Sequence, residues 1–316
     1  MGYINIIDEM RNSKKYDGNT LKFGITINNT DYIVKLPKSE ISSVYSEHIA
    51  SRFIRSLGIE CHETYLGIYN NTPVVVLKDF TSVNRRLRSY ESTRQSSEGT
   101  DIVDKLYTYK DVQYMIEKHT RMTDENKRRA ITRFWQMFIC DAILGNRDRH
   151  RGNWGYLVIK GNGADNYVPA PLYDNGASLF PDVSKLIDKY ARVINTDLEY
   201  VFIEERSERF PASLFQMKRD NGEVKRTNYY EMLGDLRINK ILAHQVKRLR
   251  ENIGPIGIYR RITGIVSELR DIVPPEYRRF YIFIVCVRYM HIIERKSIRY
   301  SFEWVKNQLD RDPRQL

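Results

Sequence analysis

The chain has 316 residues, of which 41% are hydrophobic and 29% charged, a composition typical of a folded globular protein. Lysine and arginine outnumber aspartate and glutamate by 51 to 40, and the resulting net charge of +11 favours polyanionic partners such as nucleotides, RNA or acidic proteins. The sequence has no apolar run of the roughly 18 residues that a membrane helix needs. The N-terminus lacks a signal-peptide pattern, and the three cysteines form no CxxC pair. We therefore expect a cytoplasmic protein without a disulfide framework, a zinc site or a membrane anchor.

The first 80 residues are predicted to contain several strands and one helix. Apolar and polar residues alternate from Leu21 to Ile27, and a second apolar run at 32–36 follows an Asn-rich turn, a pattern typical of a β-hairpin. A helix is predicted from about residue 43 to 57, because apolar residues recur there at helical spacing and Gly58 would end it. A short apolar strand is expected at 74–77.

The rest of the chain is predicted to be mainly helical. Residues 81–101 are polar and offer few side chains for burial, so we interpret them as a surface insertion or loop. Residues 130–144 are strongly apolar and predict a buried helix, while two strands are expected at 154–159 and 167–172. Helices dominate from about residue 186 onward.

Together these elements predict an α+β fold that divides into a small and a large lobe. The small lobe, residues 1–78, would be a twisted sheet with one helix. The large lobe, residues 79–316, would be mainly helical and would carry the two strands that follow the buried helix.

A polar loop after the buried helix carries the residues that point to chemistry. The loop spans 146–155 and places Asp148 and Asn153 in a D-x-x-x-x-N spacing. Asp174 begins an Asp-Asn-Gly motif 21 residues after Asn153. Phosphotransferases use an aspartate to accept the proton of the attacking hydroxyl, and carboxylate and amide oxygens to bind Mg²⁺, a hard cation. The order therefore predicts Asp148 as the base, with Asn153 and Asp174 as magnesium ligands.

Lys35 and Glu47 supply complementary charges in the first part of the chain. Lys35 lies in the second hairpin strand, and Glu47 lies twelve residues later on the predicted helix. In a kinase, a strand lysine neutralises the α- and β-phosphates of ATP and a helix glutamate fixes that lysine. Each residue alone is common on a protein surface, but their order with Asp148, Asn153 and Asp174 favours a phosphotransferase that uses ATP and Mg²⁺.

Two further segments lie where contacts to ATP are expected. Residues 13–20, with Gly18 and Asn19, precede the hairpin as a phosphate-covering loop would, although glycine is scarce in them. The end of the short strand, at Leu77 and Asp79, lies where a linker between the lobes would contact adenine through its backbone.

The motifs resemble those of a known family. The sequence NRDRHRGNWG at 146–155, with YDNG at 173–176, resembles the HipA-like serine/threonine kinases of bacteria, most closely their short, CtkA-type members. The resemblance implies an atypical two-lobed protein kinase that uses ATP and Mg²⁺. Carried over residue by residue, it implies Lys35 as a phosphate ligand, Glu47 as its positioning partner, Asp148 as the base, and Asn153 and Asp174 as magnesium ligands. His150, in the same loop, would hold the loop in shape by a hydrogen bond to the backbone or to Asp174.

The resemblance also implies partners. The acceptor would be a protein hydroxyl, and the basic surface suits an RNA-bound or translation-related protein, although the sequence contains no DNA- or RNA-binding motif. Members of the family autophosphorylate on serine, which makes Ser13 and Thr20 candidates. Longer toxin members carry an N-terminal subdomain that contacts an antitoxin, whereas this chain begins almost at the kinase core, so no antitoxin surface is assigned. The roles of toxin, regulator and effector secreted without a signal peptide stay open.

Three alternatives compete with this interpretation. Phosphoinositide kinases share a D-R-x-x-x-N loop and a D-N-G metal motif, and a basic surface suits acidic lipid headgroups. A kinase fold that only binds nucleotide, RNA or a protein is the second alternative, favoured by the net charge. The third is a helical interaction protein, in which Asp148 and Asn153 are ordinary turn residues.

Overall fold

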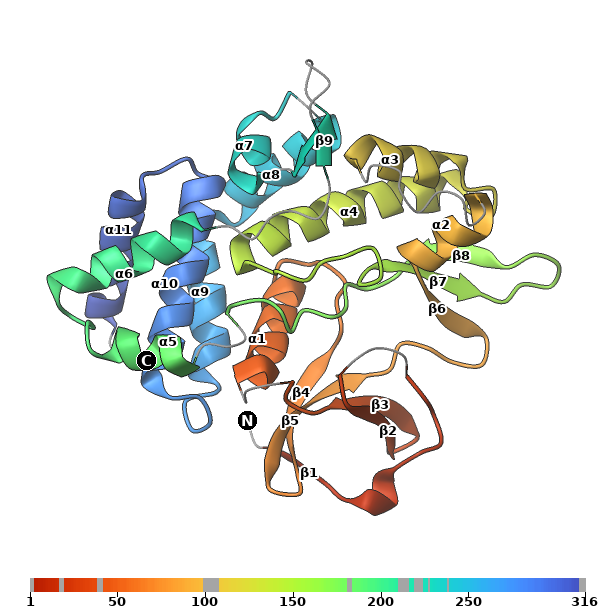
Figure 1. Ribbon diagram of the computed structural model, residues 1–316, viewed down its shortest axis with the longest axis horizontal. Helices are drawn as coiled ribbons and strands as arrows, with labels where there is room; N and C mark the ends of the chain where they lie inside the picture. The colour runs from red at the N-terminus through yellow and green to blue at the C-terminus, as the bar shows by residue number, and fades with distance from the viewer. Residues whose placement is uncertain are drawn as a thin grey trace.

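The computed structural model describes residues 3–16, 20–38, 42–98, 108–180, 184–209, 216–218, 224–226, 228–237 and 239–312 (Figure 1). The strands are β1 (Ile4–Ile6), β2 (Lys22–Ile27), β3 (Thr30–Lys35), β4 (Thr64–Tyr69), β5 (Thr72–Lys78), β6 (Arg85–Ser89), β7 (Gly155–Ile159), β8 (Asn166–Pro169), β9 (Gln216–Lys218) and β10 (Val224–Arg226). The α-helices are α1 (Ser42–Ser56), α2 (Tyr90–Glu98), α3 (Tyr109–Lys118), α4 (Asp124–Leu144), α5 (Ser184–Ala191), α6 (Asp197–Glu208), α7 (Tyr229–Gly234), α8 (Lys240–Asn252), α9 (Gly254–Ser267), α10 (Pro275–Ile292) and α11 (Ile298–Arg311). A short 3₁₀ helix, η1 (Asp8–Met10), follows β1.

The first part of the chain forms a five-stranded sheet in the order β1-β4-β5-β3-β2. β1 runs parallel to β4, and all other neighbours are antiparallel. The predicted hairpin is confirmed, and Asn28 and Asn29 form its turn with left-handed φ values of 48° and 60°. The predicted helix is confirmed as α1, which packs on β4 and β5 with Ile49 and Phe53 fully buried and ends before Gly58, whose φ is 75°.

A second, three-stranded sheet in the order β6-β7-β8 lies below α3 and α4 (Figure 1). The prediction of a surface insertion or loop over 81–101 is wrong for residues 85–98, because β6 pairs with β7, placing Arg85 opposite Ile159, and α2 follows directly. Tyr90, at the start of α2, is buried and stacks on Trp154 with ring centroids 4.5 Å apart. This strand could not be predicted from the sequence, because its exposed arginines break the apolar pattern and its partner comes from a distant part of the chain.

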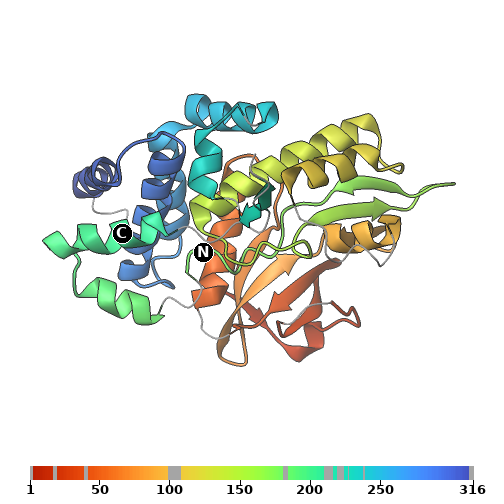
Figure 2. The same cartoon turned by 45° about the horizontal axis from the view of Figure 1, so that its top comes forward.

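Helices make up most of the remainder, as predicted. The apolar run at 130–144 is confirmed as the buried second half of α4. Helices α5, α6 and α9 to α11 gather on the side of α1 that faces away from the β7–β8 hairpin (Figures 1 and 2). α10 is buried at every residue from 280 to 290 and packs against α4, α9 and α11. The predicted α+β fold is therefore confirmed. Among the described helices, none is both long and apolar enough to cross a membrane.

Candidate active site

The loop at 146–155 is shaped by its own polar side chains. α4 ends at Gly145, whose φ of 69° turns the chain out of the helix. The side-chain oxygen of Asn146 accepts a hydrogen bond from the Asp148 amide (3.0 Å), and the side-chain amide of Asn153 donates to the Asp148 carbonyl (2.7 Å). The Asp148 side chain is exposed, and no hydrogen bond among the described residues reaches its carboxylate. This carboxylate is therefore available to a substrate hydroxyl.

His150 supports the same loop from within. Its Nδ1 accepts a hydrogen bond from the amide of Gly152 at 3.0 Å, and its ring is exposed. Of the two partners expected for His150, the backbone is the one that the structure shows. No described contact joins it to Asp174.

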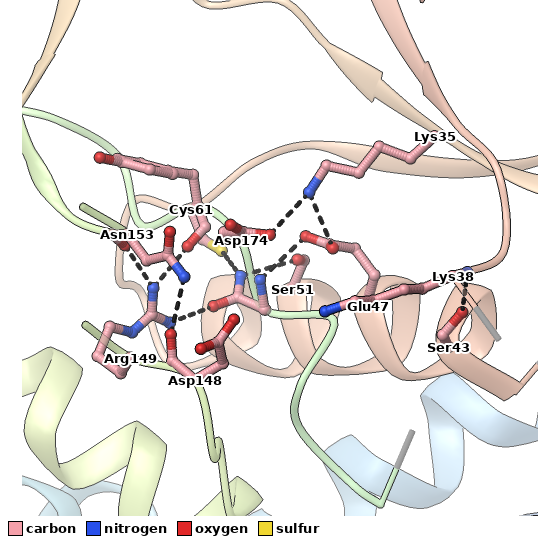
Figure 3. Close-up of polar contacts among 12 residues, drawn as sticks. Lys35, Lys38, Ser43, Glu47, Ser51, Cys61, Asp148, Arg149, Asn153 and Asp174 are labelled. Carbon is pink, nitrogen blue, oxygen red and sulfur yellow. Dashed lines mark hydrogen bonds and ion pairs between the residues drawn. The ribbon is translucent and has the colours of Figure 1, made fainter. Parts of the chain in front are cut away.

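Lys35 brings the two halves of the chain together (Figure 3). Its Nζ lies 3.1 Å from Oε2 of Glu47 on α1 and 3.0 Å from Oδ1 of Asp174. Burial alone would lower the pKa of Lys35, but the two carboxylates outweigh burial and raise that pKa above its usual value. Lys35 is therefore cationic at any physiological pH, which suits a ligand for phosphate.

Asp174 combines a constrained backbone with an accessible carboxylate. Its φ of 58° lies in the left-handed region, which aspartate tolerates better than most residues. Burial alone would raise the pKa of Asp174, but Lys35 and Arg149 lower it to about 2. The side chain keeps 44% of its surface exposed, so an ionised carboxylate is accessible to solvent beside Lys35.

The residue after Asp174 ties this segment to α1. Asn175 is fully buried, and its amide nitrogen donates to Oε1 of Glu47 at 3.0 Å. Its side-chain amide donates to Ser51 Oγ at 3.0 Å and to Cys61 Sγ at 3.2 Å. Glu47 thus receives Lys35 on one oxygen and the Asn175 amide on the other, which fixes its carboxylate in place.

Sequence reasoning missed Arg149 and Asp141. Arg149 is buried, and its Nε lies 3.0 Å from Oδ2 of Asp141, a buried acid inside α4. Its two other nitrogens donate to the carbonyls of Asn153 and Tyr173 and to the side-chain oxygen of Asn175, each at 2.6 Å. One guanidinium therefore joins α4, the loop and the Asp-Asn-Gly segment. The available signal was an acidic residue within an apolar helical run, which must be paired if it is buried.

The donor set around Asp174 suits a magnesium ion. Figure 3 shows Asp148, Asn153 and Asp174 beside Lys35 and Glu47. The hydrogen bond from Asn153 Nδ2 to the Asp148 carbonyl orients its amide and leaves the amide oxygen for another partner. An amide oxygen and an ionised carboxylate are the hard ligands that Mg²⁺ prefers, so Asn153 and Asp174 fit a magnesium site.

The segments expected to contact the rest of ATP are only partly described. Gly18 and Asn19 lie outside the described residues. Leu77 is fully buried in β5, paired with Thr64 on one side and Ile33 on the other. The structure places Asp79 directly after β5, on the segment that leads to β6, where its carboxylate contacts other side chains.

Comparisons with known proteins show the family of the chain. The family of HipA-like C-terminal domains matches residues 15–237. The serine/threonine-protein kinase CtkA of Helicobacter pylori (strain J99) is 32% identical over 241 residues, which cover 71% of this chain and 68% of CtkA.

One solved structure gives a similar result. The crystal structure of a Helicobacter pylori proinflammatory kinase CtkA matches with a TM-score of 0.70 and 27% identity, covering 91% of this chain and 94% of that one. HipA of Shewanella oneidensis, solved with HipB and operator DNA, matches with a TM-score of 0.49 and 14% identity, covering 94% of this chain and 69% of that one.

Proposed function

The chain belongs to the family of HipA-like C-terminal domains, and we propose that it transfers the γ-phosphate of ATP, with Mg²⁺, to a hydroxyl group of a protein. It is a serine/threonine kinase of the HipA-like type, so the family resemblance predicted from the sequence is confirmed. The observation that carries the finer proposal is the convergence of Lys35, Glu47 and Asp174 next to the exposed base Asp148.

Each of the two proposed lobes contributes different residues to the site. With a boundary after residue 78, the small lobe contributes Lys35 and Glu47, and the large lobe contributes the loop and Asp174. When phosphates are bound, the Lys35 ammonium would bond both to Asp174 and to the phosphates. Glu47, held by Asn175, keeps this ammonium in position. Pre-positioned charge of this kind is the main contribution that a protein makes to phosphoryl transfer.

The remaining roles follow from the exposed oxygens. Asp148 accepts the proton of the attacking hydroxyl, because its carboxylate is accessible and its backbone is fixed by Asn146 and Asn153. Asn153 and Asp174 hold the metal. When bound, Mg²⁺ would neutralise part of the negative charge of the phosphates.

The acceptor protein and the cellular compartment are proposed from charge, exposure and the state of the cysteines. The net charge of +11 suits an acidic or RNA-bound acceptor protein. Ser13 is exposed and precedes β2, so it is available for autophosphorylation, and Thr20 is half-buried. All three cysteines are free and buried, in keeping with a reducing compartment such as the cytoplasm. We assign no antitoxin surface.

Transfer of label from γ-labelled ATP tests the proposal. Wild type should label itself or an added protein acceptor on serine or threonine, and EDTA should abolish the labelling. Asp148→Asn should lose at least about a hundredfold in rate, the usual contribution of a general base. Asp174→Asn should lose a similar factor and also weaken nucleotide binding. Asp310→Asn, an exposed position on α11, is the matched control and should behave like wild type.

The possible results separate the alternatives. Label on phosphoinositide and on no protein would establish a lipid kinase instead. Binding of ATP with no transfer to any acceptor, and with no effect of EDTA, would indicate a binding module. Equal transfer by wild type, Asp148→Asn and Asp174→Asn would refute the assigned site.

A further inference from the structure

A short segment ahead of β2 lies across one face of the five-stranded sheet. We call residues 12–16 the strap. The Asn12 amide donates to the Gly24 carbonyl at 3.0 Å. A Cβ atom added to Gly24 would meet the Asn12 side-chain oxygen at 2.1 Å and the Tyr16 ring at 3.2 Å. The strap therefore packs directly on Gly24, and only a residue without a side chain leaves room for it.

The face that the strap covers is the one that points to the active site. Gly24 is paired with Ile33, and Ile33 is paired with Leu77, so the three residues share a face of the sheet. Lys35 lies two residues beyond Ile33 on the same strand and therefore shares that face, from which it reaches Asp174. A nucleotide with its phosphates at Lys35 would extend its base about 7 Å or more along this face, past Ile33 and towards Gly24 and Asp31, two residues that the strap contacts.

Asp79 fastens the strap to the linker between β5 and β6. Its side chain is 1% exposed. Its Oδ2 accepts from Lys14 Nζ at 3.0 Å and from the Tyr16 hydroxyl at 2.9 Å. Its Oδ1 accepts from the amide and the hydroxyl of Thr81, at 2.7 and 2.6 Å. Four donors occupy the carboxylate, so Asp79 has no capacity left for a direct bond to ribose or base.

A second carboxylate completes the attachment. Lys14 Nζ also lies 2.9 Å from Oδ2 of Asp31, at the start of β3, so the ammonium bridges two carboxylates. Asn12 donates to the other oxygen of Asp31 at 3.3 Å, and the Thr26 hydroxyl donates to it at 2.7 Å. The strap is thus tied to the linker and to the sheet by side chains of both charge signs.

We propose that Asp79, through Lys14 and Tyr16, is a latch that holds the strap as a wall of the slot for the nucleotide base. The inference rests on the proposed kinase function and assigns Asp79 a positioning role, not a catalytic one. It also accounts for the scarcity of glycine in residues 13–20, where only Gly18 occurs. A glycine-rich loop closes over phosphates through its backbone. Here, side-chain bonds from Lys14 and Tyr16 to Asp79 hold the strap beside the site instead.

Nucleotide kinetics of latch variants provide the first test. Asp79→Asn keeps the shape of the side chain but removes the charge that Lys14 and Tyr16 share. It should raise the KM for ATP at least tenfold, with kcat within about twofold of wild type. Tyr16→Phe keeps the ring on Gly24, loses only the hydroxyl bond, and should raise KM about threefold. Lys14→Arg should retain more affinity for ATP than Lys14→Met, because it keeps the charge.

Controls separate the latch from general damage to the fold. Tyr114→Phe alters a tyrosine on α3 that is 57% exposed and should leave KM unchanged. Titration calorimetry with a non-hydrolysable ATP analogue should show the same order of affinities as the KM values, independently of turnover.

Limited digestion with trypsin supplies a second readout. Lys14 and Lys15 lie in the strap, and its attachment should slow cleavage after them. Asp79→Asn should be cut there several-fold faster than wild type, and ATP with Mg²⁺ should slow the cut more in wild type than in the variant.

The outcomes are distinguishable. An unchanged KM in Asp79→Asn and Tyr16→Phe overturns the inference, even if cleavage is faster, because the strap would then be held without serving the nucleotide. The inference would also be overturned if every variant lost kcat and thermal stability to a similar extent, since that result would indicate a structural role only. Failure of wild type to bind ATP would refute the proposed function itself.

Discussion

Replacing Arg149 by methionine should destabilise the protein more than any surface change of charge. The guanidinium and the Asp141 carboxylate are both nearly excluded from water, with side-chain exposures of 5% and 3%. Methionine fills most of the same volume but leaves the carboxylate buried without its cation. Loss of one partner of a buried ion pair costs about 3–5 kcal/mol, whereas exposed pairs contribute about 0–1 kcal/mol.

The cost should depend on pH in a definite direction. Burial raises the pKa of Asp141 in spite of Arg149. A carboxyl whose folded pKa is raised favours the folded state while it is protonated, and that advantage is lost as the pH rises through the folded pKa. Without Arg149 the pKa of Asp141 rises further, so Arg149→Met should lie closest to wild type in acid and furthest from it above that pKa.

Urea unfolding of a double-mutant cycle measures this effect. Arg149→Met, Asp141→Asn and the double variant should show a coupling free energy of about 2–3 kcal/mol, with the double variant more stable than Arg149→Met alone. Arg299→Met, at an exposed pair with Glu303, is the control. The reasoning is refuted if Arg149→Met lies within about 1 kcal/mol of wild type at neutral pH, or if Asp141→Asn restores nothing.

Three further predictions concern Glu47, Asp174 and the turn at Gly145. Glu47→Gln keeps the bond to the Asn175 amide but loses the charge that holds Lys35, so the rate of label transfer should fall at least about tenfold; an unaffected rate would contradict the assigned pairing. The pKa of Asp174 is lowered from 3.8 to about 2, so its stabilising contribution should be complete above pH 4 and lost as the pH falls towards 2. Because the side chain is 44% exposed, solvent screening reduces the expected loss to about 1 kcal/mol; a pH-independent difference between wild type and Asp174→Asn in urea unfolding would argue against it. Gly145→Ala should cost about 1–3 kcal/mol in thermal unfolding, because φ is 69° and the new Cβ would lie 2.0 Å from Nη1 of Arg288; a melting temperature equal to that of wild type would show that this turn relaxes freely.

Local sequence patterns predicted the elements that are stabilised mainly by residues close to them in the chain. The β2–β3 hairpin follows from alternation and from asparagines that accept a left-handed turn. α1 follows from apolar residues at helical spacing and a glycine stop. β6 was interpreted as a loop, because a strand with several exposed polar residues is stabilised by partners that the local sequence does not contain. β4 was missed although none of its residues is exposed.

The candidate site divides in the same way. Lys35, Glu47, Asp148, Asn153 and Asp174 could be selected because their chemistry and order matched a known reaction. The structure brings all five together (Figure 3). Gly18 and Asn19 were assigned from their place in the chain alone and lie outside the described residues. Asp79 was selected for a backbone contact to adenine, and its side chain bonds to Lys14 and Tyr16 of the strap.

Choosing the partner of Asp141 shows why the remaining contacts could not be predicted. An acid within the apolar half of α4 requires a cation if it is buried, and the next loop offers Arg147, Arg149 and Arg151. A loop has no periodicity that could decide among the three. The left-handed turn at Gly145 sets the direction in which the chain leaves α4, and Arg149 is the one that lies 3.0 Å from the carboxylate. Sequence could therefore predict that a buried pair exists, while its identity depends on a backbone angle that only the folded chain determines.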